Sequence, residues 1–135
     1  MFKVRVITPN GVYGEEDATI LNITTPDGMR GILTNHMPIV TPIDIGRMSI
    51  GLDSDNYSYR YEYATGNGLL YFRNNKATIL LDEIYRSDYL DRAEAEAEKE
   101  ELLQKLKDRS LEEHLRERYE KELKLAKMKC KIAEQ

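Results

Sequence analysis

Apolar and polar side chains alternate along the first part of the chain with a period of two, which is typical of β-strands. Residues 2–6 alternate apolar and basic side chains, and the turn sequence Thr-Pro-Asn-Gly follows at residues 8–11. Residues 18–24 carry apolar side chains on both faces and end at the Pro-Asp-Gly turn of residues 26–28. These patterns predict one strand with a single buried face and a second strand that lies between two layers.

Further short strands are predicted up to residue 81. They cover residues 31–33, 43–50, 57–64, 69–73 and 77–81, and Gly, Asn, Asp and Ser residues separate most of them. Many short strands at regular spacing predict a β-sandwich or a barrel for residues 1–86. A sandwich of this size buries only about 60–65% of the surface of its unfolded chain, so docking onto a partner would add to its stability.

Four tyrosines lie two residues apart in one predicted strand, at Tyr57, Tyr59, Tyr61 and Tyr63. One interpretation is an aromatic platform on which bases or sugars stack. The other is a half-buried strand face, because tyrosine is a favoured strand residue and the alternating residues are polar. No basic groove accompanies the tyrosines, which favours the second interpretation.

The chain changes character at Ser87, beyond which it contains no Gly or Pro. Ser87 is a suitable N-cap, so a first helix is expected to begin there. Ser110 and Glu113 have the spacing of a capping box, which predicts the start of a second helix. The apolar stripe of the first helix comprises Leu90, Ala93, Ala97, Leu102, Leu103 and Leu106, and that of the second Leu111, Leu115, Tyr119, Leu123, Ala126 and Cys130. Two stripes of similar width and a short connection predict an antiparallel hairpin over residues 87–135, and an α+β fold for the whole chain.

This hairpin is expected to be marginally stable. Its two stripes are thin, and ion pairs four residues apart add only about 0.2–0.5 kcal/mol each, so the hairpin should be able to open. The second helix carries a basic row of Arg116, Arg118, Lys121, Lys124, Lys127, Lys129 and Lys131. Interleaved glutamates favour plain solvation of this row, and contact with an acidic partner surface is the alternative.

The composition, 41% hydrophobic and 33% charged residues, is typical of a soluble protein. Residues 1–86 hold 8 basic and 10 acidic residues, and residues 87–135 hold 12 and 14, so neither part attracts nucleic acid. Cys130 is the single cysteine and excludes an internal disulfide. We find no signal peptide and no run of about 20 apolar residues, so a cytoplasmic protein that reaches a membrane only through a partner is expected.

Catalysis by this chain is not expected. The two histidines, His36 and His114, have no Asp, Ser or Cys at a spacing that suggests a catalytic triad. The sequence also lacks a phosphate-binding glycine loop and the ligand spacing of a metal site. His36 instead stands beside Pro38 in a turn, where a structural or interface role is expected.

The sequence Gly-Ile-Leu-Thr-Asn-His-Met-Pro occupies residues 31–38. Together with the flanking residues 26–41, the turn at residues 8–11 and the strand at residues 77–81, it resembles the epsilon subunit family of bacterial F-type ATP synthases. The resemblance covers nearly the whole chain, since the order of strands and hairpin agrees as well. It implies an N-terminal ten-stranded β-sandwich followed by a C-terminal two-helix hairpin, with no catalytic residue, cofactor or metal.

The resemblance further implies a rotor subunit at the cytoplasmic face of the cell membrane, which couples the gamma subunit to the c-ring during proton-driven ATP synthesis. The hairpin would fold against the sandwich or extend along gamma toward the alpha and beta subunits, where it inhibits ATP hydrolysis. The residues expected to bind partners are Met29, Arg30, Gly31, Ile32, His36, Met37, Pro38 and Thr41. Met29 stands where relatives often have Glu, so an apolar contact is expected there.

Many relatives bind ATP through a motif at the start of the first helix. The matching residues here are Leu90, Asp91, Glu94 and Ala95, and Glu94 replaces the Arg of the motif. A carboxylate repels a triphosphate that a guanidinium would bind. Arg92 does not substitute, because two positions along a helix correspond to about 200° of rotation. We therefore expect ATP to bind weakly or not at all.

A free-standing ligand-binding β-sandwich with a helical oligomerisation tail is the alternative interpretation. Its positive feature is the tyrosine run, and a stable homodimer without affinity for gamma would support it. An enzyme is a third class, for which His36→Ala would have to abolish a turnover of the isolated chain.

Overall fold

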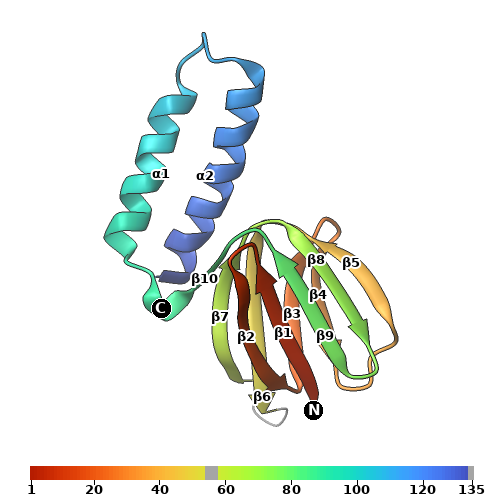
Figure 1. The fold of residues 1–135 in the computed structure, drawn as a ribbon. Coiled ribbons are helices and arrows are strands. Elements are labelled where there is room, and N and C mark those ends of the chain that lie inside the picture. Colours follow the sequence, from red (N-terminus) through yellow and green to blue (C-terminus); the bar gives the residue numbers. More distant parts are fainter. Residues whose placement is uncertain (54–57, 134–135) are drawn as a thin grey trace.

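The computed structural model describes the backbone of residues 1–53 and 58–133 and the side chains of residues 1–51 and 61–133. Two five-stranded sheets pack face to face, and a pair of helices follows at one end of them (Figure 1). Sheet A has the strand order β2 (Gly11–Ala18), β1 (Phe2–Thr8), β9 (Lys76–Leu81), β8 (Gly68–Arg73) and β5 (Ile39–Ile43). Sheet B has the order β10 (Ile84–Arg86), β7 (Ser58–Thr65), β6 (Gly46–Asp53), β3 (Ile20–Thr25) and β4 (Gly28–Leu33). The expected ten-stranded sandwich with a C-terminal hairpin is confirmed.

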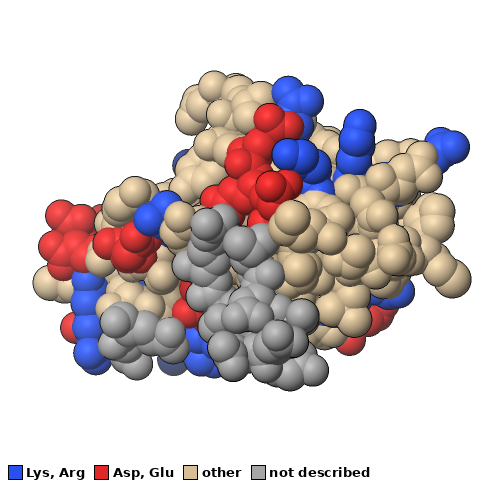
Figure 2. Space-filling view, turned by 90° about the horizontal axis from the view of Figure 1, so that it is seen from below, with Lys and Arg blue, Asp and Glu red and all other residues tan. Residues whose placement is uncertain are grey.

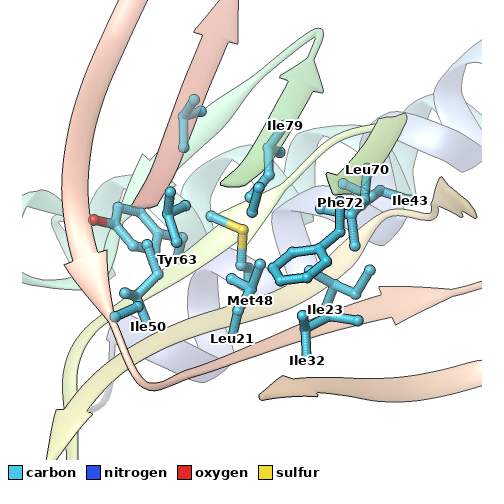
Figure 3. Packing of buried hydrophobic residues seen from close by; sticks show 14 of the residues in the cluster. Leu21, Ile23, Ile32, Ile43, Met48, Ile50, Tyr63, Leu70, Phe72 and Ile79 are labelled. Carbon is cyan, nitrogen blue, oxygen red and sulfur yellow. The ribbon is translucent and has the colours of Figure 1, made fainter. Parts of the chain in front are cut away.

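The core of the sandwich is built from the inward faces of the alternating strands (Figure 3). On β1 the side chains of Phe2, Val4 and Val6 are buried, as the period of two predicts. The rings of Phe2 and Phe72 meet edge to face with their centroids 5.4 Å apart. This core is separate from the apolar clusters that involve the helices.

The tyrosines of β7 contribute to this core. Tyr63 is buried in it and Tyr61 packs against it, so neither offers a free ring face for an aromatic platform. Tyr57 and the side chain of Tyr59 lie outside the described residues. The half-buried interpretation is confirmed for Tyr61, and Tyr63 is buried more deeply than expected.

The prediction of one strand over residues 43–50 is wrong, because the chain crosses there from sheet A to sheet B. β5 ends at Ile43, and the Asp44 N–H donates to the Thr24 carbonyl at 2.9 Å. β6 begins at Gly46, where a Cβ atom would collide with the side chain of Thr24. A glycine therefore permits the close approach of β3 at the crossing.

The pattern also missed three strands and shortened another. β5 was predicted only at its last residue, Ile43. β2 is an edge strand whose residues are mostly exposed, so it lacks the alternation that marked its neighbours. β10 has only three residues, too few for a period. β4 begins at Gly28 rather than at residue 31.

The helical part begins with a 3₁₀ turn, η1 (Ser87–Tyr89), and continues with α1 (Arg92–Leu106) and α2 (Glu113–Ala133). The prediction that Ser87 caps the first helix is wrong, because Asp91 does so: its carboxylate accepts from Ala93 N at 2.9 Å. The capping box is wrong as well. The hydroxyl of Ser110 donates to Asp108 at 2.6 Å and caps no helix.

The two helices lie side by side as an antiparallel hairpin that extends away from the sandwich (Figure 1). Ala95 and Leu102 of α1 are buried, whereas Ala93 and Ala97, predicted in the stripe, are exposed. The second stripe is largely confirmed, since Leu123, Ala126 and Cys130 are buried. No helix in the described part of the chain is long and apolar enough to cross a membrane.

Candidate functional site

The outward face of sheet A carries a continuous row of apolar side chains, called here the outer row. The strand registers place its residues opposite one another across all five strands, in the order Val12, Ile7, Leu80, Leu69 and Pro42. Val12 is 54% exposed, Leu80 44% and Leu69 40%. Leu69 and Leu80 also line a shallow hollow of about 350 Å³ beside Ile7. Exposed apolar surface that is continuous in this way is typical of a protein interface.

The same face becomes basic toward the opposite end of its strands. Val40 and Tyr71, which are paired in register, add to the apolar part. Beyond them, Arg73, Lys76 and Lys3 are aligned across three strands. Lys3 forms an ion pair with Asp17 at 3.1 Å. The face thus combines an apolar half with a half that has a surplus of positive charge.

The loop between β4 and β5 holds His36, the residue that the sequence singled out most strongly. Its ring meets Phe72 edge to face at 5.9 Å, and Nδ1 lies 2.7 Å from the Met37 carbonyl. A carbonyl only accepts hydrogen bonds, so Nδ1 carries the proton and donates to it. Met37 beside it is 76% exposed. Figure 2 views the molecule from this end. Its right half, on the side of β5 and β8, is mostly uncharged, with Lys, Arg and a few Asp or Glu side chains at its margin.

The predicted partner-binding residues divide into a group open to a partner and a buried group. Met29, Arg30 and Gly31 lie exposed on the edge strand β4, and His36, Met37 and Pro38 lie in the following loop. The side chains of Ile32 and Thr41 instead face the interior and are buried. Ile32 is 0% and Thr41 9% exposed as whole residues, so neither can make a substantial contact with a partner.

The residues of the ATP motif meet at the joint between sandwich and hairpin. Leu90, Asp91, Glu94 and Ala95 all line a cavity of about 250 Å³. Its other walls come from Tyr85, Tyr89, Glu98 and Lys129. Burial is the largest cause that raises the pKa of the Tyr85 hydroxyl, and the hydrogen bond that this hydroxyl donates to Glu83 at 2.8 Å raises it further. Tyr85 therefore stays neutral.

This cavity does not fit a triphosphate. Three of its lining residues, Asp91, Glu94 and Glu98, are acidic. Lys129 is the one cation among its lining residues, and it already lies 3.4 Å from Glu98. Asp91 is occupied as the N-cap of α1. No guanidinium lines the cavity among the described residues, so the cavity's carboxylates would repel the phosphate oxygens, which need hydrogen-bond donors.

Among the described residues, an apolar cluster and two lysines hold the joint, namely Lys124 and the Lys129 described above. Leu125 and Ile132 of α2 pack on Ile45 and Ala64 of the sandwich. Lys124 Nζ reaches Asp44 at 3.2 Å. Because only one end of α2 touches the sandwich, most of the hairpin has no contact with the sheets (Figure 1).

The linker before α1 is fixed by Arg86. Its guanidinium binds both carboxylate oxygens of Asp88 at 2.6 Å and lies over the rings of Tyr61 and Tyr89, at 4.2 and 4.5 Å from their centroids. This hydrogen bonding lowers the pKa of Asp88. The linker therefore has a defined conformation on the edge of sheet B.

No catalytic constellation forms among the described residues. His114 is exposed on α2, where its Nδ1 lies 3.3 Å from Glu112, and the His36 ring contacts the Met37 carbonyl and Phe72. Within residues 1–53 and 58–133, no group of His, Cys, Asp and Glu could hold a metal. The outer row was missed by the sequence-based reasoning, because its residues come from five strands that only the register brings side by side.

Comparison with known proteins agrees with this architecture. Residues 1–87 match the family model described as "ATP synthase, Delta/Epsilon chain, beta-sandwich domain". The ATP synthase epsilon chain of Caldicellulosiruptor bescii is 37% identical and covers 99% of this chain and 94% of the relative. That of Sulfurihydrogenibium sp. is 34% identical, over 90% of this chain and 89% of the relative.

Solved structures show the same fold. A chain of the Euglena gracilis mitochondrial ATP synthase, in a structure of OSCP, F1 and c-ring, aligns with a TM-score of 0.77 at 17% identity, over 92% of this chain and 76% of the other. A chain of the Tetrahymena thermophila central stalk and c-ring aligns with a TM-score of 0.61 at 16% identity, over 97% and 95%. The resemblance drawn from residues 26–41 is confirmed: this chain belongs to the epsilon chain family of the ATP synthases, whose members are non-catalytic subunits of an enzyme complex.

Proposed function

We propose that this chain is a rotor subunit that couples the gamma subunit to the c-ring of an ATP synthase during proton-driven ATP synthesis. The observation that carries the proposal is the outer row, which extends across all five strands of sheet A. A monomer that exposes such a surface gains free energy when a partner covers it. The similar chains in structures of a central stalk and a c-ring support the same role.

The division of labour follows the two parts of the chain. Residues 1–86 bind the partners and residues 87–135 regulate. Gamma covers the outer row and the loop with His36 and Met37, and the exposed residues 29–31 contribute to the contact with the c-ring. The aligned Arg73, Lys76 and Lys3 call for acidic residues on the facing partner surface. The complex alone holds the chain at the cytoplasmic face of the membrane.

The test is the affinity of the chain for the gamma subunit. Replacing Leu69 and Leu80 by Ser removes apolar area from the centre of the outer row, where both side chains are already partly in water, so folding is preserved. We expect gamma to bind about 30-fold more weakly, which corresponds to about 2 kcal/mol. Ile20→Ser, on the outward face of sheet B, is the matched control and leaves the affinity unchanged. Equal affinity of a folded Leu69/Leu80 variant would refute the proposal.

The hairpin acts as a brake on ATP hydrolysis when it leaves the sandwich. Two observations support this role: the core of the sandwich is separate from the helical clusters, and the hairpin is attached at one end only. A chain that ends at Arg86 should therefore keep its affinity for gamma. In the reconstituted complex we expect it to hydrolyse ATP faster than the full chain. Equal rates at equal gamma occupancy would contradict the regulatory role.

A further inference from the structure

Two asparagine side chains join the β4–β5 loop to the β8–β9 turn. The Asn35 N–H donates to Asn75 Oδ1 at 2.7 Å, and Asn75 Nδ2 donates to Asn35 Oδ1 at 2.9 Å. We call this pair of bonds the asparagine clasp. It connects residues 40 positions apart in the sequence and lies one residue before His36.

Both residues have backbone conformations that asparagine tolerates better than other side chains. Asn35 has φ of 67° and Asn75 has φ of 58°, in the left-handed region where only Gly is freely accommodated. Asn74 also has a positive φ, 52°, so residues 74 and 75 form the tight turn that joins β8 to β9. The Asn75 carbonyl in turn accepts from Lys3 N at 3.0 Å. Asn75 is thus fixed to sheet A by its own backbone before its side chain reaches the loop.

The loop itself has few other restraints. Residues 34–38 belong to no strand, and Met37 and Pro38 are exposed. The His36 N–H donates to the Leu33 carbonyl at 3.0 Å, and the His36 ring rests edge-on against Phe72. The clasp adds two bonds from outside the loop, so it determines how the loop sits on the end of sheet A.

We infer that Asn75 is a positioning residue, which holds the His36–Met37 loop in its binding conformation before a partner arrives. The inference rests on the proposed function, in which this loop contacts gamma. A loop that is already ordered loses less conformational entropy on binding, so the complex is tighter. Asn75 itself need not touch the partner.

The decisive variant is Asn75→Gly, since Gly keeps the positive φ of the turn and deletes both bonds of the clasp. In the isolated chain we expect the Asn35 amide to exchange its hydrogen about tenfold faster, and we expect the affinity for gamma to fall about tenfold. Asn74→Gly is the matched control, because it makes the same change at the neighbouring positive φ without touching the clasp. It should alter neither quantity. Asn75→Asp keeps the acceptor for the Asn35 N–H and should retain most of the protection.

A second variant separates this inference from the proposed function. Met37→Ala leaves the clasp intact and removes the most exposed side chain of the loop. If Met37→Ala weakens gamma binding and Asn75→Gly does not, the positioning role is overturned while the proposed interface stands. If neither changes the affinity, the positioning role and the assignment of this loop to the gamma contact both fail, whereas the outer row is tested separately by the Leu69/Leu80 variant. Unchanged exchange of the Asn35 amide in Asn75→Gly would overturn the clasp itself.

Discussion

Lys129 of α2 lies between Tyr85 of β10 and Glu98 of α1, with its Nζ 3.8 Å from the centre of the tyrosine ring and 3.4 Å from the carboxylate. Its side chain is only 11% exposed. A single cation therefore joins the sandwich, the first helix and the second helix at their common meeting point. The cavity lined by Leu90, Asp91, Glu94 and Ala95 therefore contains an internal ion pair.

Lys129→Met should loosen the docked hairpin. Met keeps the apolar stem of the side chain and removes the charge that interacts with Tyr85 and Glu98. We expect docking to weaken by about 1 kcal/mol, since a partly desolvated cation–π contact and one ion pair are lost. Hydrogen exchange of the α2 amides near Leu125 and Ile132 should accelerate about fivefold.

Lys127→Met is the control for this change. Lys127 lies on the same helix but is exposed, so its replacement should leave the exchange of the docking face unchanged. Faster exchange in both variants would point to a general loss of helix stability. That result would contradict the specific role of Lys129.

Glu94→Arg should create affinity for ATP at the joint. The wild-type cavity holds three carboxylates, and we expect no heat of binding at millimolar ATP. The substitution removes one of them and supplies a guanidinium that can bind phosphate oxygens bidentately. We expect the affinity to rise about 10- to 100-fold, the usual range for a hydrogen bond to a charged group.

Isothermal titration checks this prediction, with Glu100→Arg as the control. Glu100 is exposed on the same helix, six residues after Glu94. Glu100→Arg therefore makes the same change of charge outside the cavity. Micromolar binding by the unchanged chain would show that the acidic lining does not exclude the nucleotide. An equal gain of ATP affinity in the two Arg variants would mean that the change in net charge alone determines this affinity.

The strands that the sequence predicted correctly are those whose alternation reports burial directly. On β1, the basic residues Lys3 and Arg5 mark the solvent side and leave no ambiguity. Where neighbouring residues on both faces are apolar, as with Leu69 and Leu70 on β8, the pair shows a strand but not its outward side. The outer row crosses five strands, so it became visible only with the register of the strands.

In the hairpin, the sequence does not show which alanines of α1 are buried. Ala93, Ala95 and Ala97 are chemically equal, and their burial depends on where the helix begins and how it faces its partner. Asp91 rather than Ser87 caps α1, and the buried face of the helix carries Ala95 and Leu102. The asparagine clasp was likewise out of reach, since nothing in the sequence relates Asn35 to Asn75.

Gly68→Ala should destabilise the sandwich strongly. Gly68 begins β8, and a Cβ atom there would overlap the main-chain carbonyl of Leu80 on the adjacent strand β9. Backbone atoms cannot move aside without breaking the ladder, so we expect a loss of about 2–3 kcal/mol in the free energy of unfolding. Gly14→Ala is the control, because Gly14 has open space around it. Chemical denaturation should show a lower midpoint for the first variant alone, and equal midpoints would contradict the packing argument.

The tip of the hairpin should respond to acid through Asp108. Its carboxylate accepts from the Ser110 hydroxyl at 2.6 Å and from the Ser110 N–H at 2.9 Å, and these bonds lower the pKa of Asp108. A lowered carboxyl pKa in the folded chain means that the tip gains stability above the unfolded pKa, about 3.9, and loses it as the pH falls through the lower folded value. The Ser110 amide should therefore lose its protection from hydrogen exchange only at strongly acidic pH. Asp108→Ala should show fast exchange at all pH values, and a wild-type amide that loses protection near neutral pH would contradict the assignment.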